Sequence, residues 1–161
     1  MLKFSYKNLF IILFFIIIFS IDRISKIYIL NLFEVDQLYN IYINSFLNIN
    51  LIWNTGIGFG LFSSDTNLIY NSFTLLIILI NIIIIIMIFK STNYYSFLLI
   101  MILGGSMGNL FDRIYYKAVP DFIDLHYNDF HWFVFNIADI FITIGVVCLI
   151  LVELILDKKK D

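Results

Sequence analysis

Four long apolar segments constrain this chain more than any other feature of its sequence. They cover residues 9–32, 68–89, 94–111 and 133–156. A helix needs about 20 mostly apolar residues to cross the hydrocarbon core of a bilayer. Within that core every backbone N–H and C=O group needs a hydrogen-bond partner, and a helix supplies these partners inside each segment. The sequence therefore predicts an all-α membrane protein with four transmembrane helices.

The composition agrees with a membrane location and argues against other classes of protein. Hydrophobic residues make up 61% of the 161 residues and charged residues only 14%, so a water-soluble fold could not bury the apolar side chains. Because the ten Lys and Arg residues do not gather on one face, we expect no nucleic-acid partner. The single cysteine, Cys148, allows neither an intrachain disulfide nor a cysteine-based metal site.

The basic residues next to the apolar segments predict the orientation in the membrane. Those that share one side are Lys3, Lys7, Lys90, Lys158, Lys159 and Lys160. We expect this side to be the cytoplasm, with both chain termini on it. The run from Leu9 is then the first span and not a cleavable signal. Residues 33–67 and 112–132 face the outside.

The first outer segment, residues 33–67, contains the pattern of a β-strand. From Phe46 to Trp53 apolar and polar residues nearly alternate, which is the period of a half-buried strand. A turn punctuated by glycines follows at residues 54–60. We predict a small extracytoplasmic β-sheet that lies against the membrane surface, within a single membrane-embedded domain over residues 1–161.

Polar side chains interrupt the apolar segments at a common depth. A carboxylate in a membrane span costs roughly 2.5–3.5 kcal/mol on insertion scales, so each one is a candidate for function. Counted along each helix at about 1.5 Å per residue, Asp22, Asn109 and Asp139 all lie toward the outer end. Asn109 shares a helix face with Asp112, and Asn136 shares one with Asp139, because each pair is three residues apart. The sequence predicts a polar pocket near the outer leaflet.

Other polar and small residues in or near the spans favour structural roles. Gly104 and Gly108 form a small-residue pair that lets a helix approach its neighbour closely. Asn81, alone in its span, is expected to make an interhelical hydrogen bond. His126 and His131 lack the H-E-x-x-H spacing of zinc ligands, so we interpret them as residues of an outer loop at the membrane interface. We expect no metal site and no cofactor.

Two functions are compatible with carboxylates inside a membrane. A peptidase without a usable Ser, Cys or metal needs two carboxylates that share a proton. The alternative is a proton or ion transport protein, which also uses intramembrane carboxylates. A conduction path should carry polar groups through the full membrane thickness, and the inner halves of these segments are almost bare. The pattern favours the peptidase.

Five short motifs follow one another in order over nearly the whole chain. They are Asp22-x-x-Ser-Lys26, Asn54-Thr-Gly56 with Phe59-Gly60, Gly104-Gly105-x-x-Gly108-Asn109-x-x-Asp112-Arg113, Val119-x-Asp121-Phe122 and Phe135-Asn136-x-Ala138-Asp139. Together they resemble the motif series of the lipoprotein signal peptidase family, also called signal peptidase II. Ser25, Ile57-Gly58 and Pro120 depart from the usual pattern of that family.

The resemblance implies an aspartyl endopeptidase of the bacterial cytoplasmic membrane. Such enzymes remove the signal peptide of a prolipoprotein immediately before a cysteine that carries a diacylglyceryl group. The resemblance makes Asp121 and Asp139 the catalytic pair. The residues that it assigns to substrate binding or support are Asp22, Lys26, Asn54, Gly56, Asn109, Asp112, Arg113, Asn136 and Ala138.

Further expectations concern partners and the arrangement of the site. The expected partners are diacylglyceryl-modified prolipoproteins and membrane lipids, and we expect the protein to be a monomer. We expect the active site to lie near the outer leaflet. Asp112 and Arg113 are expected to act as a pair that holds the loop presenting Asp121.

Overall fold

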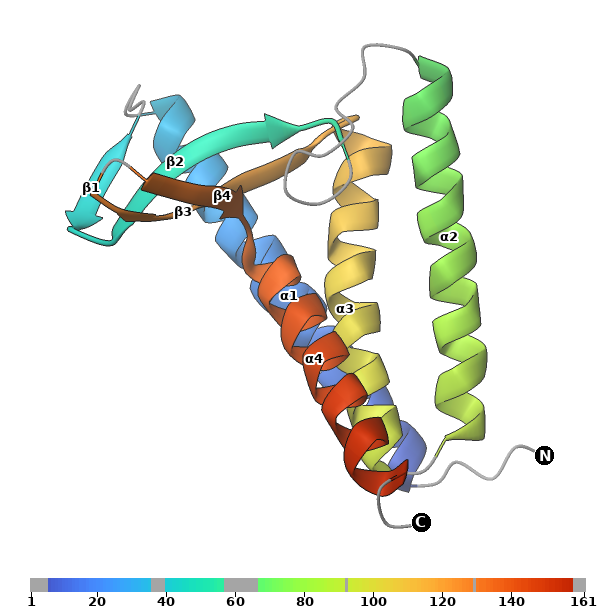
Figure 1. The fold of residues 1–161 in the computed structure, drawn as a ribbon. Coiled ribbons are helices and arrows are strands. Elements are labelled where there is room, and N and C mark those ends of the chain that lie inside the picture. The colour runs from blue at the N-terminus through green and yellow to red at the C-terminus, as the bar shows by residue number, and fades with distance from the viewer. Residues whose placement is uncertain (1–5, 36–39, 57–66, 92, 129, 158–161) are drawn as a thin grey trace.

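The computed structural model describes residues 6–35, 40–56, 67–91, 93–128 and 130–157 (Figure 1). The glycine-rich residues 57–60 and the terminal lysines Lys3 and Lys158 to Lys160 lie outside these ranges. The elements, in chain order, are α1 (Tyr6–Val35), β1 (Ile41–Asn44), β2 (Leu47–Asn54), α2 (Asn67–Lys90), α3 (Asn93–Tyr115), β3 (Val119–Tyr127), β4 (Phe130–Phe135) and α4 (Ile137–Asp157).

The helices form a bundle around α3, which packs against α1, α2 and α4. The start of α1, the connection between α2 and α3 and the end of α4 lie at one end of the bundle, and the sheet lies at the other (Figure 1). Three of the described helices are long and apolar enough to cross a membrane: Leu68–Lys90, Tyr94–Tyr115 and Ile137–Ile155. α1 has 30 residues but carries four charged residues in its second half: Asp22, Arg23, Lys26 and Glu34.

Two predicted helix boundaries are wrong. The last helix was expected from residue 133, but residues 130–135 form strand β4 and α4 begins at Ile137. A short apolar run fits a strand or a helix equally well by pattern, and pairing with β3 decides for the strand. The third helix continues to Tyr115, so Asp112 lies inside it and not in an outer segment.

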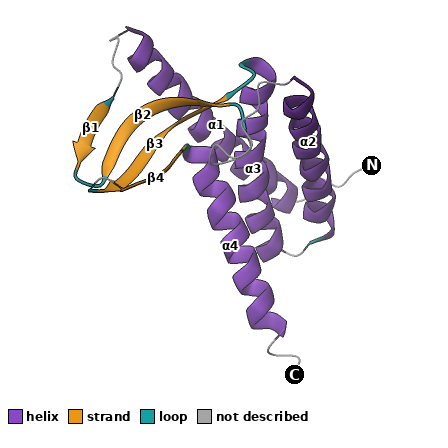
Figure 2. Ribbon diagram, turned by 45° about the horizontal axis from the view of Figure 1, so that its top comes forward, coloured by secondary structure: helices purple, strands orange, loops and turns teal. Residues whose placement is uncertain are grey.

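The four strands form one antiparallel sheet in the order β1-β2-β3-β4 (Figure 2). The strand predicted from the alternating residues is present as β2. The prediction that His126 and His131 lie in an outer loop is wrong, because they lie on β3 and β4, which form the other half of the sheet. The pairing of β3 with β2 joins residues far apart in the sequence, such as Asn48 with Asp124, and no local sequence pattern predicts it.

The polar side of β2 is the buried side. Asn48 and Asn54 are 8% and 7% exposed, whereas Trp53 on the same strand is 44% exposed. A sheet in water would bury the apolar side. Here the asparagines turn toward the protein and leave apolar side chains exposed.

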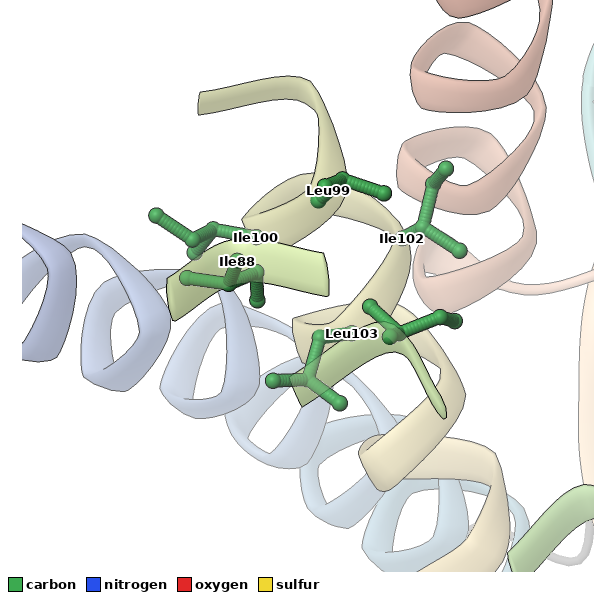
Figure 3. Packing of buried hydrophobic residues seen from close by; sticks show 6 residues of the cluster. Ile88, Leu99, Ile100, Ile102 and Leu103 are labelled. Carbon is green, nitrogen blue, oxygen red and sulfur yellow. The ribbon is translucent and has the colours of Figure 1, made fainter. Parts of the chain in front are cut away.

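The apolar core lies where α2 and α3 pack together (Figure 3). Its buried members are Ile84, Ile88, Leu99, Ile100, Ile102 and Leu103. Asn81, on α2, is 3% exposed, and its amide has no hydrogen-bond partner among the described residues. The interhelical hydrogen bond predicted for Asn81 is therefore not found in this part of the chain.

The close approach predicted from two glycines of α3 is confirmed, and the neighbour is α1. A Cβ atom on Gly104 would lie 2.7 Å from Ile18 Cγ2. A Cβ atom on Gly108 would clash with the carboxylate of Asp22. Glycine is required at residue 108 so that the Asp22 carboxylate can lie directly against the backbone of α3.

Candidate active site

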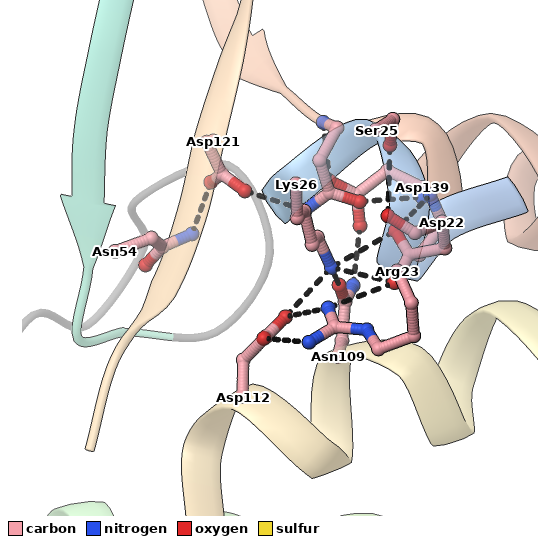
Figure 4. Close-up of polar contacts among 11 residues, drawn as sticks. Asp22, Arg23, Ser25, Lys26, Asn54, Asn109, Asp112, Asp121 and Asp139 are labelled. Atoms are coloured by element: carbon pink, nitrogen blue, oxygen red, sulfur yellow. Dashed lines mark hydrogen bonds and ion pairs between the residues drawn. The ribbon is translucent and has the colours of Figure 1, made fainter. Parts of the chain in front are cut away.

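Four charged side chains meet between α1 and α3 and form what we call the ion cluster: Asp22, Arg23, Lys26 and Asp112 (Figure 4). The Lys26 ammonium lies 2.9 Å from Asp22 Oδ1 and 2.7 Å from Asp112 Oδ2. Arg23 donates to both oxygens of Asp112, at 2.6 and 2.7 Å. The side chains of Asp22, Lys26 and Asp112 are fully buried.

The charges of the ion cluster balance as two cations and two anions. A buried charge is tolerated only when it is paired and hydrogen-bonded. Lys26 meets this condition by donating also to Asn109 Oδ1 at 2.8 Å. The arrangement explains how α1 carries charged residues within a long apolar helix.

Arg23 is a member of this cluster that the sequence analysis missed. Its guanidinium also lies over the ring of Phe111, 4.8 Å from the ring centroid, a favourable cation–π geometry. A usable signal was present, since an arginine within an apolar segment is as much a candidate for function as an aspartate. Two buried aspartates, Asp22 and Asp112, need two cations for charge balance, and Lys26 supplies only one.

The start of α4 is fixed by a reciprocal capping arrangement. Asn136 Oδ1 accepts from the backbone N–H of Asp139 at 3.2 Å, and Asp139 Oδ2 accepts from the backbone N–H of Asn136 at 3.1 Å. This is the logic of a capping box, with Asn and Asp in the two positions. Asp22 Oδ1 accepts from the backbone N–H of Ala138 at 3.1 Å, so a carboxylate of α1 satisfies a free donor of α4.

Asp121 and Asp139, which we call the carboxyl pair, are joined by amide side chains. Asn136 Nδ2 donates to Asp121 Oδ1 at 2.6 Å, while the backbone of the same residue donates to Asp139. Asn54 Nδ2 donates to Asp121 Oδ2 at 2.9 Å, and Asn109 Nδ2 donates to Asp139 Oδ1 at 2.8 Å. No Lys or Arg contacts either carboxylate among the described residues.

The environment of Asp121 favours its protonated form. The pKa of Asp121 is raised to about 7, chiefly because burial disfavours the charged carboxylate and also because Asp139 lies close by. The hydrogen bonds from Asn54 and Asn136 act in the opposite direction. Asp121 can therefore hold a proton near neutral pH.

A second network of contacts, made by Gly56 and Arg113, holds Asn54 in place. Asn54 Oδ1 accepts from the backbone N–H of Gly56 at 2.9 Å, and the carbonyl of Gly56 accepts from Arg113. Arg113 also lies over the ring of Tyr70, whose hydroxyl donates to the Arg113 carbonyl. The predicted Asp112–Arg113 pair is wrong, because neighbouring helical residues point in different directions and Asp112 pairs with the cations of α1.

Two pockets border the carboxyl pair and share Asp139. One, of about 400 Å³, is lined by both carboxylates, by Arg113 and by apolar residues of α2 and α4 such as Ile77 and Val147. The other, of about 570 Å³, lies between the sheet and α4 with mainly aromatic walls, and Asp139 lines it as well. The carboxylates thus face space that an apolar ligand can enter.

Comparisons with known proteins place this geometry in a family. A family model described as signal peptidase (SPase) II matches residues 14–155. A lipoprotein signal peptidase of Pelagibacter ubique (strain HTCC1062) is 59% identical over 99% of this chain and 94% of its own length. A lipoprotein signal peptidase of Anaplasma marginale (strain Florida) is 32% identical over 89% of this chain and 84% of its own length. The chain belongs to the signal peptidase II family.

Solved structures agree with this assignment. Two bacterial membrane enzymes resemble the chain, with TM-scores of 0.71 and 0.63 at 25% and 26% identity. The first alignment covers 94% of this chain and 90% of the other, and the second covers 89% and 92%. With its three apolar helices, this signal peptidase II family member is a membrane protein and a protease.

The structure of this signal peptidase II family member brings the residues expected at the site into one contiguous network. Direct contacts link the carboxyl pair to the three asparagines, and Asn109 links it to the ion cluster. Gly56, Arg113 and Ala138 contribute through the backbone contacts described above. His126 and His131 lie apart from this network, on strands β3 and β4.

Proposed function

We propose that this chain is a lipoprotein signal peptidase that cleaves prolipoproteins immediately before the diacylglyceryl-modified cysteine. Membership of the signal peptidase II family and the names of its relatives support this activity. The observation that carries the chemistry is the carboxyl pair, bridged by amides and open to an apolar pocket. The family is one of peptidases, so the comparisons do not support the transport alternative.

The proposed mechanism is that of an aspartyl peptidase whose two carboxyl groups share one proton. The raised pKa of Asp121 supports placing that proton on Asp121 in the resting enzyme. Asp139 takes a proton from a water molecule as the water oxygen bonds to the scissile carbonyl carbon. Asp121 gives its proton to the carbonyl oxygen, and a neutral gem-diol forms.

The second half of the reaction returns the protons. Asp139 gives its proton to the leaving amide nitrogen, Asp121 takes a proton from one gem-diol hydroxyl, and the carbon–nitrogen bond breaks. The products are the free signal peptide with a new carboxyl end and a lipoprotein with amino-terminal cysteine. Asp121 again holds one proton, so the pair is ready for another cycle.

Amide partners suit this role better than cations would. An adjacent Lys or Arg would hold a carboxylate in its charged form, and a proton could then not be shared. Asn54, Asn109 and Asn136 fix the positions of the carboxylates without adding charge. The pair keeps its geometry while one of its members remains free to carry the proton.

The pocket supports a lipidated peptide as the substrate. Apolar residues of α2 and α4 line it beside the carboxyl pair, and burial of acyl chains contributes about 0.8 kcal/mol per methylene. Arg113 lines the same pocket, and its Nε and Nη1 have no hydrogen-bond partner among the described residues. We propose that these donors bind a peptide carbonyl of the substrate.

We propose that α1 is a fourth span and that both termini are cytoplasmic, in the bacterial cytoplasmic membrane. The balanced ion cluster supports this, because its paired charges allow a helix with charged residues to lie in a bilayer. The site would then lie near the outer leaflet, where the sheet end of the bundle meets the membrane surface (Figure 1). The proposed enzyme acts as a monomer.

A cleavage assay tests the function. Detergent-solubilised protein is incubated with a diacylglyceryl-modified precursor and with the same precursor lacking lipid, and mass spectrometry identifies the new amino terminus. We expect cleavage before the modified cysteine in the first substrate and little or none in the second. Equal cleavage of both would show that the acyl chains are not recognised, and no cleavage of either would overturn the proposal.

Thiol labelling tests the topology. Ser45 lies in the exposed turn between β1 and β2, so Ser45→Cys in a Cys148→Ser background offers one reporter. An impermeant thiol reagent should label this cysteine in intact spheroplasts. Labelling only after the membrane is permeabilised would place the sheet in the cytoplasm and contradict the proposed orientation.

A further inference from the structure

Both histidines of the chain lie together with a buried carboxylate on the sheet. His126 and His131 are paired across β3 and β4, and their rings stack with centroids 5.1 Å apart. Asp124, on β3, is 2% exposed. Its two carboxylate oxygens lie 3.0 and 2.9 Å from His131 Nδ1. One ligand atom from each of the three residues lies within 4.8 Å of the other two.

Two buried polar atoms beside this cluster lack hydrogen-bond partners among the described residues. They are His126 Nδ1 and Asn48 Oδ1. Asn48 is directly opposite Asp124 in the pairing of β2 with β3, so the two side chains share one face of the sheet. An unsatisfied buried acceptor is costly. Two such atoms next to a carboxylate and an imidazole indicate a site that is completed by a ligand.

We propose that Asp124, His126 and His131 bind a divalent transition-metal ion of the zinc class. Two imidazoles and one carboxylate suit Zn²⁺ and its neighbours, whereas Mg²⁺ and Ca²⁺ prefer sites made of oxygen ligands. Three protein ligands leave a fourth position for water. The His131 side chain is 52% exposed, which gives the ion a path of entry.

The site needs only a small adjustment to hold such an ion. Metal–ligand bonds of about 2.0–2.1 Å place the ligand atoms of a tetrahedral site roughly 3.3 Å apart. The half-exposed ring of His131 can rotate to bring its nitrogen closer while Asp124 and His126 stay in β3. Asn48 Oδ1 can then accept a hydrogen bond from metal-bound water.

The bound ion would join β3 to β4 directly, and its water would contact Asn48 on β2. Asp124 is three residues along β3 from Asp121, and His126 lines the aromatic pocket that also contains Asp139. The ion stabilises the β3–β4 hairpin and that wall of the pocket, and it takes no part in hydrolysis. This inference is independent of the proposed function.

The proposed site does not follow the H-E-x-x-H spacing, whose absence from the sequence argued against a metal site. H-E-x-x-H places two ligands on one face of a helix, but these histidines lie on adjacent strands. In a hairpin, cross-strand register sets the distance between ligands, and residues five positions apart can face each other. The expected absence of a metal site therefore rested on the wrong secondary structure for residues 126 and 131.

Metal titration of protein purified without a polyhistidine tag tests the proposal. Because the chain has two histidines, His126→Ala/His131→Ala removes every imidazole, and Tyr127→Ala serves as a control on the exposed part of the same hairpin. We expect one Zn²⁺ per chain, weakened at least about 10-fold by either single histidine change and unchanged by the control. Saturating Zn²⁺ should raise the unfolding temperature of wild type but not of the double variant.

Cobalt spectroscopy identifies the ligands directly. Co²⁺ bound at this site should show the visible absorption of a low-coordinate nitrogen and oxygen site, and the band should be lost in His131→Ala, where the half-exposed position tolerates truncation. Binding should weaken below about pH 6, because histidine must be neutral to bind metal. Absence of stoichiometric binding to wild type, or equal binding by the double histidine variant, would overturn the proposal.

Discussion

The ion cluster and the carboxyl pair each contain two aspartates, yet their partners are of opposite kinds. Asp22 and Asp112 are held by a lysine and an arginine, whereas Asp121 and Asp139 are held by asparagines and backbone amides. Cations keep a carboxylate ionised, and amides fix it without settling its charge. The first group is suited to hold helices together and the second to move a proton.

Asn109 connects the two groups and is oriented by both. Its Oδ1 accepts from Lys26 at 2.8 Å, and its Nδ2 donates to Asp139 at 2.8 Å. Because the ammonium can only donate, Lys26 determines which end of the amide faces Asp139. The ion cluster thus acts on the carboxyl pair through orientation, without a direct contact.

Removing one carboxylate of the carboxyl pair should reduce activity more than any other change. Asp121→Asn and Asp139→Asn should each lower kcat by about 1,000-fold or more, and the double variant should be scarcely worse, because residues that act as one unit are not additive. Glu153→Gln, an exposed change on α4, is the control. Substantial turnover by folded Asp121→Asn protein would break the distinction between the two groups.

Substitutions in the ion cluster should lower the free energy of unfolding more than they lower catalytic activity. Lys26→Met leaves two buried carboxylates with one cation, and breaking a buried pair costs about 3–5 kcal/mol. Adding Asp112→Asn restores the charge balance and should recover part of the loss. Thermal unfolding in detergent measures both, with Lys90→Met at the exposed end of α2 as control. A stable Lys26→Met protein would mean that the cluster is not held by its charges.

Asn109→Leu tests whether Asn109 orients the Asp139 carboxylate or only contributes to folding. It removes the donor to Asp139, so we expect kcat to fall by roughly 10–100-fold, about the cost of losing a residue that orients a reacting group. Asn81→Leu is the matched control, since that buried amide has no partner among the described residues and its loss should stabilise the protein. Equal activity in the two variants would show that Asn109 does not position Asp139.

A smaller change is expected in the pH dependence of kcat. With its pKa raised to about 7, Asp121 loses the proton that catalysis needs above that pH, and kcat should fall. Asn54→Ala removes a donor that stabilises the charged form, so this falling limb should move to higher pH. A limb that does not move would show that Asp121 is not the titrating group.

The same pKa predicts a stability effect with a defined sign. A carboxyl group whose pKa is higher in the folded state stabilises the fold while protonated, and this contribution is lost as pH rises from about 4 to about 7. Asp121→Asn has no charge to bury. Its unfolding temperature should therefore exceed that of wild type at pH 8 and match it near pH 4.

Sequence patterns predicted the helices well because the bilayer requires them. Long apolar runs have one solution in lipid, and the positions of Asn109 and Asp139 along their helices predicted that the two side chains meet, which their hydrogen bond confirms. Patterns failed in the second outer segment, where the polar residues Asp124, His126 and His131 obscured the strands β3 and β4. The pairing of β3 with β2 is non-local, so no local pattern predicts it. Sequence patterns also gave the wrong partner for Asp112, which pairs with Arg23 and Lys26 of α1 and not with its neighbour Arg113.

The amino-acid sequence alone shows that the chain needs apolar surroundings and which residue types are available for chemistry. Which carboxylates contact cations and which contact amides follows from how the helices and strands pack together. A residue's own helix or strand fixes its direction and depth, but its partner comes from another element tens of residues away. The difference between a structural aspartate and one that can share a proton is set by that partner.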